Sequence, residues 1–254
     1  MKCTFLGVGS AFDAERTSTS ILIESGSRSA LLDCGFNAGH AFAQKASNPA
    51  ELDMLWISHF HGDHFFGVPF LLGFLFSTGR QKTLHICGPA GLEQKIRDLT
   101  ALAYPHLMDK IPFDILFEEF NSGDMKSVAG FRIGVCNVEH SPPALAVRIE
   151  IDEKSVFYSG DGSVTAECAA LAYRADLGIM EAQQLSTPVK GHSTVTQVIE
   201  FASIAKIGQV ALVHLDPFMR TCKKVDLQHI LDTSESVEFF LPEDGQRVTP
   251  GKAM

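Results

Sequence analysis

The stretch HFHGDH, from His59 to His64, decides how this chain of 254 residues is interpreted. It directly follows MLWI, residues 54 to 57, a short apolar run that predicts a buried strand. Neutral imidazole and carboxylate groups bind divalent ions such as zinc, and crowding so many of them at a strand end without an ion would bury unpaired polar groups. The stretch therefore predicts a metal site rather than a histidine-rich surface turn.

Length and composition indicate the number of domains and the location of the protein. At 45% apolar residues the chain can bury a substantial core, and α/β folds of this length commonly form one domain, so we expect residues 1–254 to be a single domain. The start runs into a strand-like segment without a secretory signal, which predicts a cytoplasmic protein. The longest apolar stretch, Phe65 to Phe76, contains Gly and Pro and is far shorter than the roughly 20 residues that span a bilayer. No membrane anchor is therefore expected.

Net charge and cysteine spacing argue against electrostatic binding to nucleic acid or membranes and against a disulfide framework. The net charge of −9 gives no bulk attraction to nucleic acid or to an anionic membrane. The six cysteines form no CxxC pair and lie mostly in apolar segments, which predicts reduced, buried thiols. We assign them no chemistry.

Strands alternate with helices along the chain, which argues for a layered α/β architecture. The polar tail from residue 243 to 254 is expected to be loosely held. The Gly-rich GVGS at residues 7–10 could approach a phosphate, but a plain turn is the favoured interpretation. Helices are predicted at 37–47, 67–77, 90–104, 164–174, 194–205 and 223–232. Strands are predicted at 2–8, 18–24, 28–34, 54–57, 83–87, 115–120, 131–138, 144–151, 155–159, 177–181, 210–214 and 236–241.

The HxHxDH pattern after an apolar strand resembles the signature of the metallo-β-lactamase superfamily. Its members mostly use one or two metal ions to hydrolyse esters, amides, thioesters or phosphodiesters. His61 stands where the diiron flavoprotein branch has a carboxylate, which points to a hydrolytic site. The resemblance implies an α/β fold of the metallo-β-lactamase type, a four-layer αββα sandwich, with the site where the strand-end loops of its two sheets meet.

The resemblance also implies a ligand set for two divalent metal ions. Zinc is the expected ion, and manganese and iron remain alternatives. The three ligands outside the HxHxDH stretch each follow a predicted strand. On this pattern His59, His61 and His140 hold one ion, Asp63, His64 and His214 hold the other, and Asp161 bridges them.

The segment KGHSTV at residues 190–195 resembles the HST element of ribonuclease Z and its phosphodiesterase relatives. Thr194 and Gln197 also have the spacing of a capping box, which predicts a helix start without reference to the family. The resemblance assigns His192 to protonation of the leaving group and Glu181 to pairing with that histidine. Asp63 would orient the attacking water or accept its proton, while two metal ions about 3.5–4 Å apart activate that water.

One departure from ribonuclease Z bears on the substrate. That family carries a long tRNA-gripping arm, usually between the positions that correspond to His140 and Asp161, and only 20 residues separate them here. The expected substrate is therefore a small-molecule or short phosphodiester, with tRNA 3′ processing and thioester or lactone hydrolysis as alternatives. A scaffold protein with a degenerate site is the alternative outside enzymes. The natural substrate and the oligomeric state, including a homo-oligomer, stay open.

Overall fold

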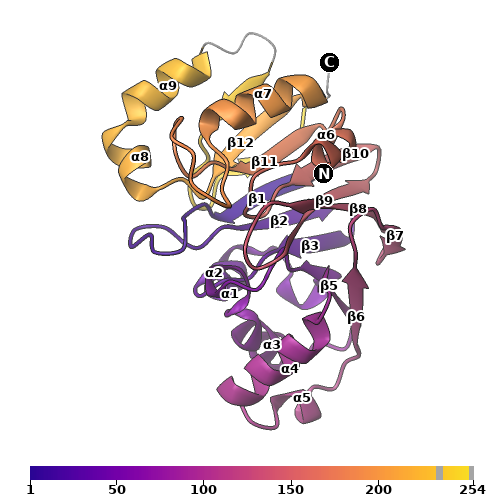
Figure 1. Ribbon diagram of the computed structural model, residues 1–254. Helices are drawn as coiled ribbons and strands as arrows, with labels where there is room; N and C mark the ends of the chain where they lie inside the picture. Colours follow the sequence, from indigo (N-terminus) through magenta and orange to yellow (C-terminus); the bar gives the residue numbers. More distant parts are fainter. Residues whose placement is uncertain (233–236, 252–254) are drawn as a thin grey trace.

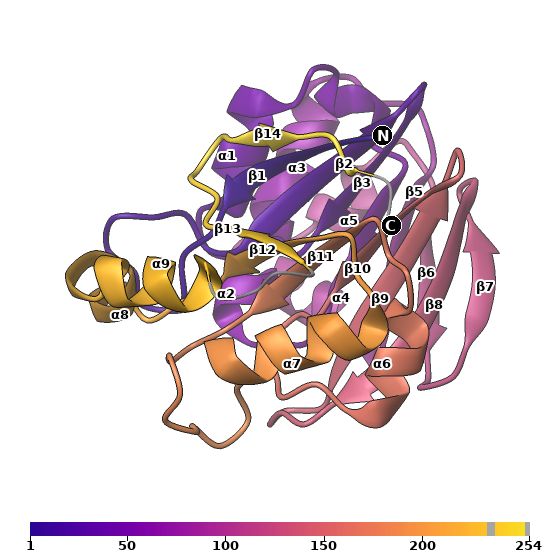
Figure 2. The same cartoon turned by 90° about the horizontal axis from the view of Figure 1, so that it is seen from above.

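The computed structural model describes residues 1–232 and 237–251. Two seven-stranded sheets pack face to face, and helices cover the outer face of each sheet (Figures 1 and 2). This arrangement confirms the predicted four-layer αββα sandwich.

The N-terminal sheet has the strand order β14-β1-β2-β3-β4-β5-β6. Its strands are β1 (Lys2–Gly7), β2 (Ser20–Ser25), β3 (Arg28–Leu32), β4 (Met54–Trp56), β5 (Leu84–Pro89), β6 (Ile115–Phe120) and β14 (Arg247–Val248). The helices of this half are α1 (Ala38–Lys45), α2 (Gly62–Phe65), α3 (Val68–Ser77), α4 (Leu92–Ala103) and α5 (Leu107–Lys110), with a 3-10 turn at Pro49–Glu51.

The C-terminal sheet has the order β13-β12-β11-β10-β9-β8-β7. Its strands are β7 (Met125–Val128), β8 (Phe131–Val138), β9 (Ala144–Ile151), β10 (Lys154–Tyr158), β11 (Leu177–Glu181), β12 (Gln209–Val213) and β13 (Glu238–Phe240). The helices of this half are α6 (Ala166–Ala172), α7 (Val195–Ala205), α8 (Pro217–Cys222) and α9 (Lys224–Asp232), and α8 begins at the edge of the sandwich rather than over the sheet.

Alternate residues of each strand pack into different cores. In β4, Trp56 packs into the core between the two sheets, whereas Leu55 packs under the helices of the N-terminal half. Because successive side chains of a strand point to opposite faces, a strand buried on both faces reads as an unbroken apolar run. This burial explains why MLWI is apolar throughout, and it leaves the polar residues that follow at the edge of the sandwich.

The prediction of a loosely held tail is wrong for its described part. Arg247–Val248 form β14, which pairs with β1. The two carboxylate oxygens of Asp244 accept hydrogen bonds from the backbone N–H groups of Val8 and Thr17, at 3.1 and 2.7 Å. Polar composition suggested a solvated segment, but this tail supplies a strand that pairs with β1 and a carboxylate that holds the loop after β1. Residues 252–254 lie outside the described residues.

Several other boundaries differ from the prediction. Strand β5 continues through Gly88 and Pro89, because proline at the last position of a strand removes few ladder hydrogen bonds. The strands and helices β7, α2, α5 and α8 were not predicted. Residue 236 of the predicted last strand lies outside the described residues.

The prediction of buried cysteines holds for five of the six, and Cys222 is exposed. In the described ranges, no helix is long and apolar enough to cross a membrane.

Candidate metal centre

The ligands predicted from sequence meet at one edge of the sandwich. The HFHGDH stretch follows β4 of the N-terminal sheet, and three further residues follow strands of the C-terminal sheet. Strands β8, β10, β11 and β12 run in the same direction, so residues that follow them lie at the same edge. His140 comes shortly after β8, Asp161 after β10 and His214 directly after β12. Sheet topology therefore gathers residues that are up to 155 positions apart (59 to 214).

The seven predicted ligands form two overlapping groups. In each group the candidate ligand atoms all lie within 4.8 Å of one another. Asp161 is shared by both groups, in the place predicted for the bridging carboxylate. The first group is His59, His61, His140 and Asp161, and the second is Asp63, His64, Asp161 and His214.

The donor atoms at the centre fit divalent ions. His64 Nε2 lies 3.2 Å from Asp63 Oδ2 and 3.2 Å from Asp161 Oδ1. His59 Nε2, His64 Nε2 and Asp161 Oδ1 are buried without a hydrogen-bond partner. Buried polar atoms are costly when unpaired, and imidazole nitrogens facing carboxylate oxygens are a donor set that zinc-like ions accept. The buried donor atoms therefore fit two adjacent divalent ions. The ligand role of each residue stays a prediction.

Electrostatics favour a cation at this position. Burial alone would raise the pKa of the Asp161 carboxyl, but His214 and His64 hold that pKa well below its ordinary value. The pKa of Asp63 is lowered in the same way, against burial, by hydrogen bonds from His214 and His64. Burial keeps the pKa of His59 well below its ordinary value, so this ring is neutral at pH 7. Against burial, Asp161 raises the pKa of His64 and of His214, so a bound cation would replace protons on these two rings.

His192 and Glu181 lie beside the ligand groups. Glu181 Oε1 accepts a hydrogen bond from His192 Nδ1 at 3.1 Å and from the backbone N–H groups of Gly162 and Ser193 at 3.1 and 3.0 Å. Burial lowers the pKa of His192, but Glu181 outweighs it and the net shift is upward. The predicted capping box of Thr194 is confirmed at the start of α7. The structure thus pairs His192 with Glu181, while its role in proton donation stays a prediction.

The loop that carries His192 is tied to a ligand of the first group. The backbone carbonyl of Gly191 accepts a hydrogen bond from His140 Nδ1 at 2.7 Å. The rings of His140 and His192 lie 5.1 Å apart between centroids. Any displacement of this loop would therefore also move a candidate metal ligand.

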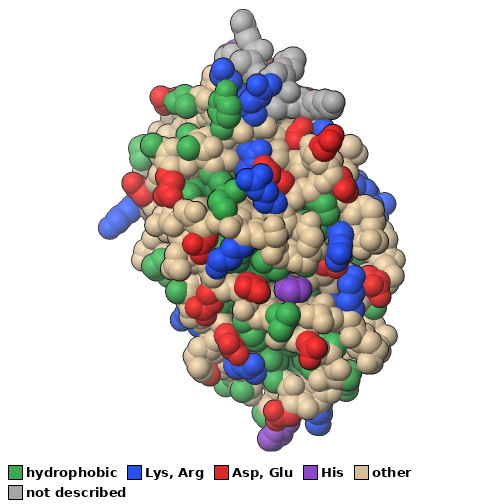
Figure 3. Space-filling model, turned by 90° about the vertical axis from the view of Figure 1, so that its right-hand side faces the viewer, with side chains coloured by type: hydrophobic (Ala, Val, Ile, Leu, Met, Phe, Trp, Pro, Cys, Tyr) green, Lys and Arg blue, Asp and Glu red, His purple; other side chains and the backbone are tan. Residues whose placement is uncertain are grey.

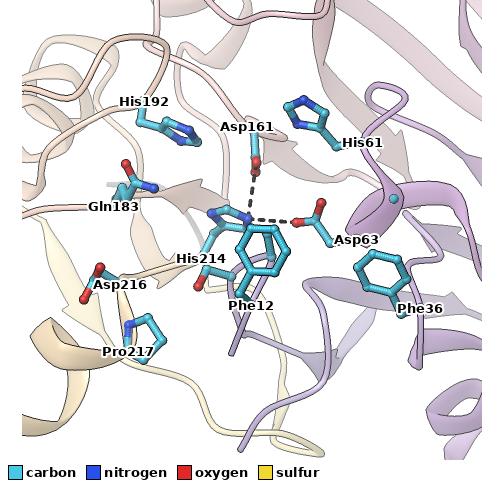
Figure 4. A pocket seen from close by; sticks show the side chains of 13 residues that line it. Phe12, Phe36, His61, Asp63, Asp161, Gln183, His192, His214, Asp216 and Pro217 are labelled. Carbon is cyan, nitrogen blue, oxygen red and sulfur yellow. Dashed lines mark hydrogen bonds and ion pairs between the residues drawn. The ribbon is translucent and has the colours of Figure 1, made fainter. Parts of the chain in front are cut away.

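A cavity of about 450 Å³ opens above the ligand groups. Its floor includes candidate ligands, and Figure 4 shows His192 and Gln183 on one side of it. The mouth includes Phe12, which is 93% exposed, and Phe36, which is 54% exposed. No spacing pattern in the sequence marks these two phenylalanines as lining a cavity. Ser10 also lines the cavity, and it belongs to the Gly-rich GVGS segment that the sequence marked as a turn.

The glycines of that segment have a packing explanation. A Cβ atom on Gly7 would lie 2.2 Å from the backbone oxygen of Ser18, so the close approach of two chain segments requires glycine there. This contact supports the plain structural interpretation of GVGS.

Solved structures with the same architecture define the class. The metallo-β-lactamase fold protein YhfI from Bacillus subtilis matches with a TM-score of 0.81 and 25% identity, covering 97% of this chain and 98% of that one. The short form of human tRNase Z matches with a TM-score of 0.80 and 21% identity, covering 98% and 99%. The fold and the site therefore define a protein of the metallo-β-lactamase superfamily that resembles ribonuclease Z, as predicted.

Sequence comparison defines the family within that class. The family model described as anti-Pycsar protein Apyc1 matches residues 1–231, and the chain belongs to this family. A ribonuclease Z from Methanosarcina acetivorans is 30% identical over 146 residues, which cover 57% of this chain and 47% of that protein. The match thus spans about half the length of this curated relative.

Proposed function

We propose that the chain is a phosphodiesterase that uses two divalent metal ions, held by the seven predicted ligands. The observation that carries this proposal is the pair of ligand groups that share Asp161 on the floor of the cavity. When bound, two ions would activate a water molecule and neutralise charge on the phosphoryl oxygens. Zinc is the proposed ion, because imidazole predominates among the ligands, and manganese and iron are the alternatives.

The chain's own residues would handle the protons. Asp63 is ionised, lines the cavity and would orient the attacking water or accept its proton. His192 also lines the cavity, and Glu181 occupies its Nδ1. The other ring nitrogen, Nε2, is then available to donate a proton to the leaving alkoxide.

A small substrate suits this site better than tRNA. Residues 141–160 contain only β9, a turn at Asp152 and Glu153, β10 and short connections, so no arm projects between His140 and Asp161. The cavity has the size of a small-molecule site. Away from the cavity, on the right-hand side of Figure 1, Figure 3 shows Lys and Arg interspersed with Asp and Glu and no extended basic surface, so this face offers no separate grip for nucleic acid. We therefore favour a small or short phosphodiester.

Family membership and thiol chemistry bear on the biological setting. The family description names an antagonism toward Pycsar, and we propose that hydrolysis at this site is how the chain would exert it. Five of the six cysteines are buried, as expected for the reduced thiols of the cytoplasmic location that we propose.

Processing of tRNA 3′ ends is the second candidate, because of the similarity to ribonuclease Z. The two candidates separate when one metal-analysed preparation is assayed on bis(p-nitrophenyl) phosphate, a precursor tRNA, a thioester and a lactone. We expect phosphodiester turnover without efficient tRNA cleavage. Efficient, specific cleavage of the tRNA would favour the second candidate, and turnover of only the thioester or lactone would refute both.

A further inference from the structure

Asp33 is a buried carboxylate at the end of β3 that belongs to neither ligand group. Its Oδ1 accepts the backbone N–H of Ser58 at 2.7 Å. Its Oδ2 accepts three further hydrogen bonds, from Ser58 Oγ at 2.7 Å, His64 Nδ1 at 2.7 Å and Tyr158 Oη at 2.6 Å. Asp33 also has a φ of 56°, which non-glycine residues adopt only when surrounding contacts hold them there. Asp33 is therefore a fixed acceptor beneath the site.

These contacts orient one histidine of each ligand group. Because His64 Nδ1 donates to Asp33, its Nε2 is left to face Asp63 and Asp161. Ser58 Oγ donates to Asp33, so at 3.0 Å it accepts the Nδ1 proton of His59. Each ring is then held with Nε2 toward the centre, the nitrogen through which it would bind a metal ion.

Tyr158 connects this arrangement to the other sheet. It ends β10 of the C-terminal sheet, three residues before Asp161, whereas Asp33 follows β3 of the N-terminal sheet. Burial and the neighbouring carboxylate of Asp33 raise the pKa of Tyr158 well above its ordinary value, so its hydroxyl stays a donor. The hydrogen bond from Tyr158 to Asp33 thus joins the two sheets directly below the ligands.

We propose that Asp33 and Tyr158 form an inter-sheet clasp that fixes the His59 and His64 rings and thereby prepares both ion positions together. Both are positioning residues, since neither belongs to a candidate ligand group. This inference rests on the proposed metal-dependent function. It assigns to the tyrosine of YSGD, residues 158–161, a role distinct from core packing.

Tyr158→Phe tests the clasp because it removes one hydroxyl and retains the ring. Metal-stripped protein would be titrated with Zn²⁺ against a chromophoric chelator. We expect affinity at both positions to fall about 10–100-fold, as on loss of other contacts that orient metal ligands. Ser58→Ala should weaken mainly the position that includes His59, because Ser58 Oγ is the group that contacts that ring.

Ser20→Ala is the matched control. Ser20 is also buried, and its Oγ donates at 2.7 Å to the backbone carbonyl of Asp33 rather than to the carboxylate. This variant should lower the melting temperature and leave zinc affinity unchanged. Equal weakening of zinc binding by Ser20→Ala and Tyr158→Phe would show general destabilisation and refute the clasp.

Two further outcomes separate the clasp from the proposed function. Unchanged affinity in Tyr158→Phe, with two ions bound by the unsubstituted protein, would refute the clasp and leave the metal centre standing. Failure of the unsubstituted protein to bind zinc would refute the metal centre, and the clasp with it.

Discussion

The two ligand groups differ in composition and in exposure. The first combines three imidazoles with Asp161, and two of its members, His61 and His140, are only partly buried. The second combines two imidazoles with two carboxylates, all of them buried. A site with more negative charge and less water attracts a cation more strongly, so we expect the second position to bind its ion more tightly. The difference in composition and burial therefore predicts different affinities at adjacent positions on one scaffold.

Replacing Asp161 should have the largest effect, because this residue belongs to both groups. In Asp161→Asn we expect affinity for both ions to fall by more than about 100-fold, the upper range for residues that merely orient ligands. Elemental analysis after dialysis measures the loss. Substitution of His64 or His140 alone should lose less metal. Retention of two ions by Asp161→Asn would contradict its bridging position.

His192→Ala should have the next largest effect, on turnover but not on metal content. For a diester with an alkyl leaving group, we expect turnover to fall about 10²–10⁴-fold, because the leaving alkoxide loses its proton donor. A nitrophenolate leaving group needs little protonation, so its turnover should fall much less. Equal losses on both substrates would indicate a phosphate clamp instead, and loss of metal would make His192 a ligand.

Paired substitutions test the difference between the two positions directly. His61→Ala should release the first ion and leave about one ion per chain, because the second group stays intact. His64→Ala should instead empty the more tightly binding position. Competition with a chelator measures which affinity is lost in each variant. Release of the same ion by both would contradict the division into two groups.

The smallest expected effect is a shift in pH dependence. Glu181 raises the pKa of His192, so the folded-state value lies above that of the unfolded chain. The stability that the His192–Glu181 pair contributes is therefore complete below the pKa of His192 in the unfolded chain, and it is lost as pH rises through the pKa of His192 in the folded chain. Proton donation by His192 declines as pH rises through the same folded-state pKa. In Glu181→Gln the alkaline limb of alkyl-diester turnover should move to lower pH. An unmoved limb would remove His192 from the proton-donating role.

Much of the floor of the site could be predicted because its ligands follow strands in a fixed order. The HFHGDH stretch supplies four of them within six residues, and its resemblance to a known pattern located the other three. The layered fold followed from the alternation of strands and helices. These features are local in sequence, or repeat at a known spacing.

The remainder depends on contacts that sequence spacing does not encode. Asp33 and Tyr158 are 125 residues apart, and only the packing of the two sheets brings them together. Phe12 reaches the cavity mouth from an irregular loop. Strand β14 was missed because two residues of pairing leave no periodic signal in a polar tail.

The central claim is that two ions act together at this site. The most direct test adds zinc stepwise to metal-stripped protein and follows turnover of bis(p-nitrophenyl) phosphate. We predict little turnover until the tighter position is filled, followed by a rise that levels off at two ions per chain. Full turnover at one ion per chain, or turnover independent of added metal, would contradict the account.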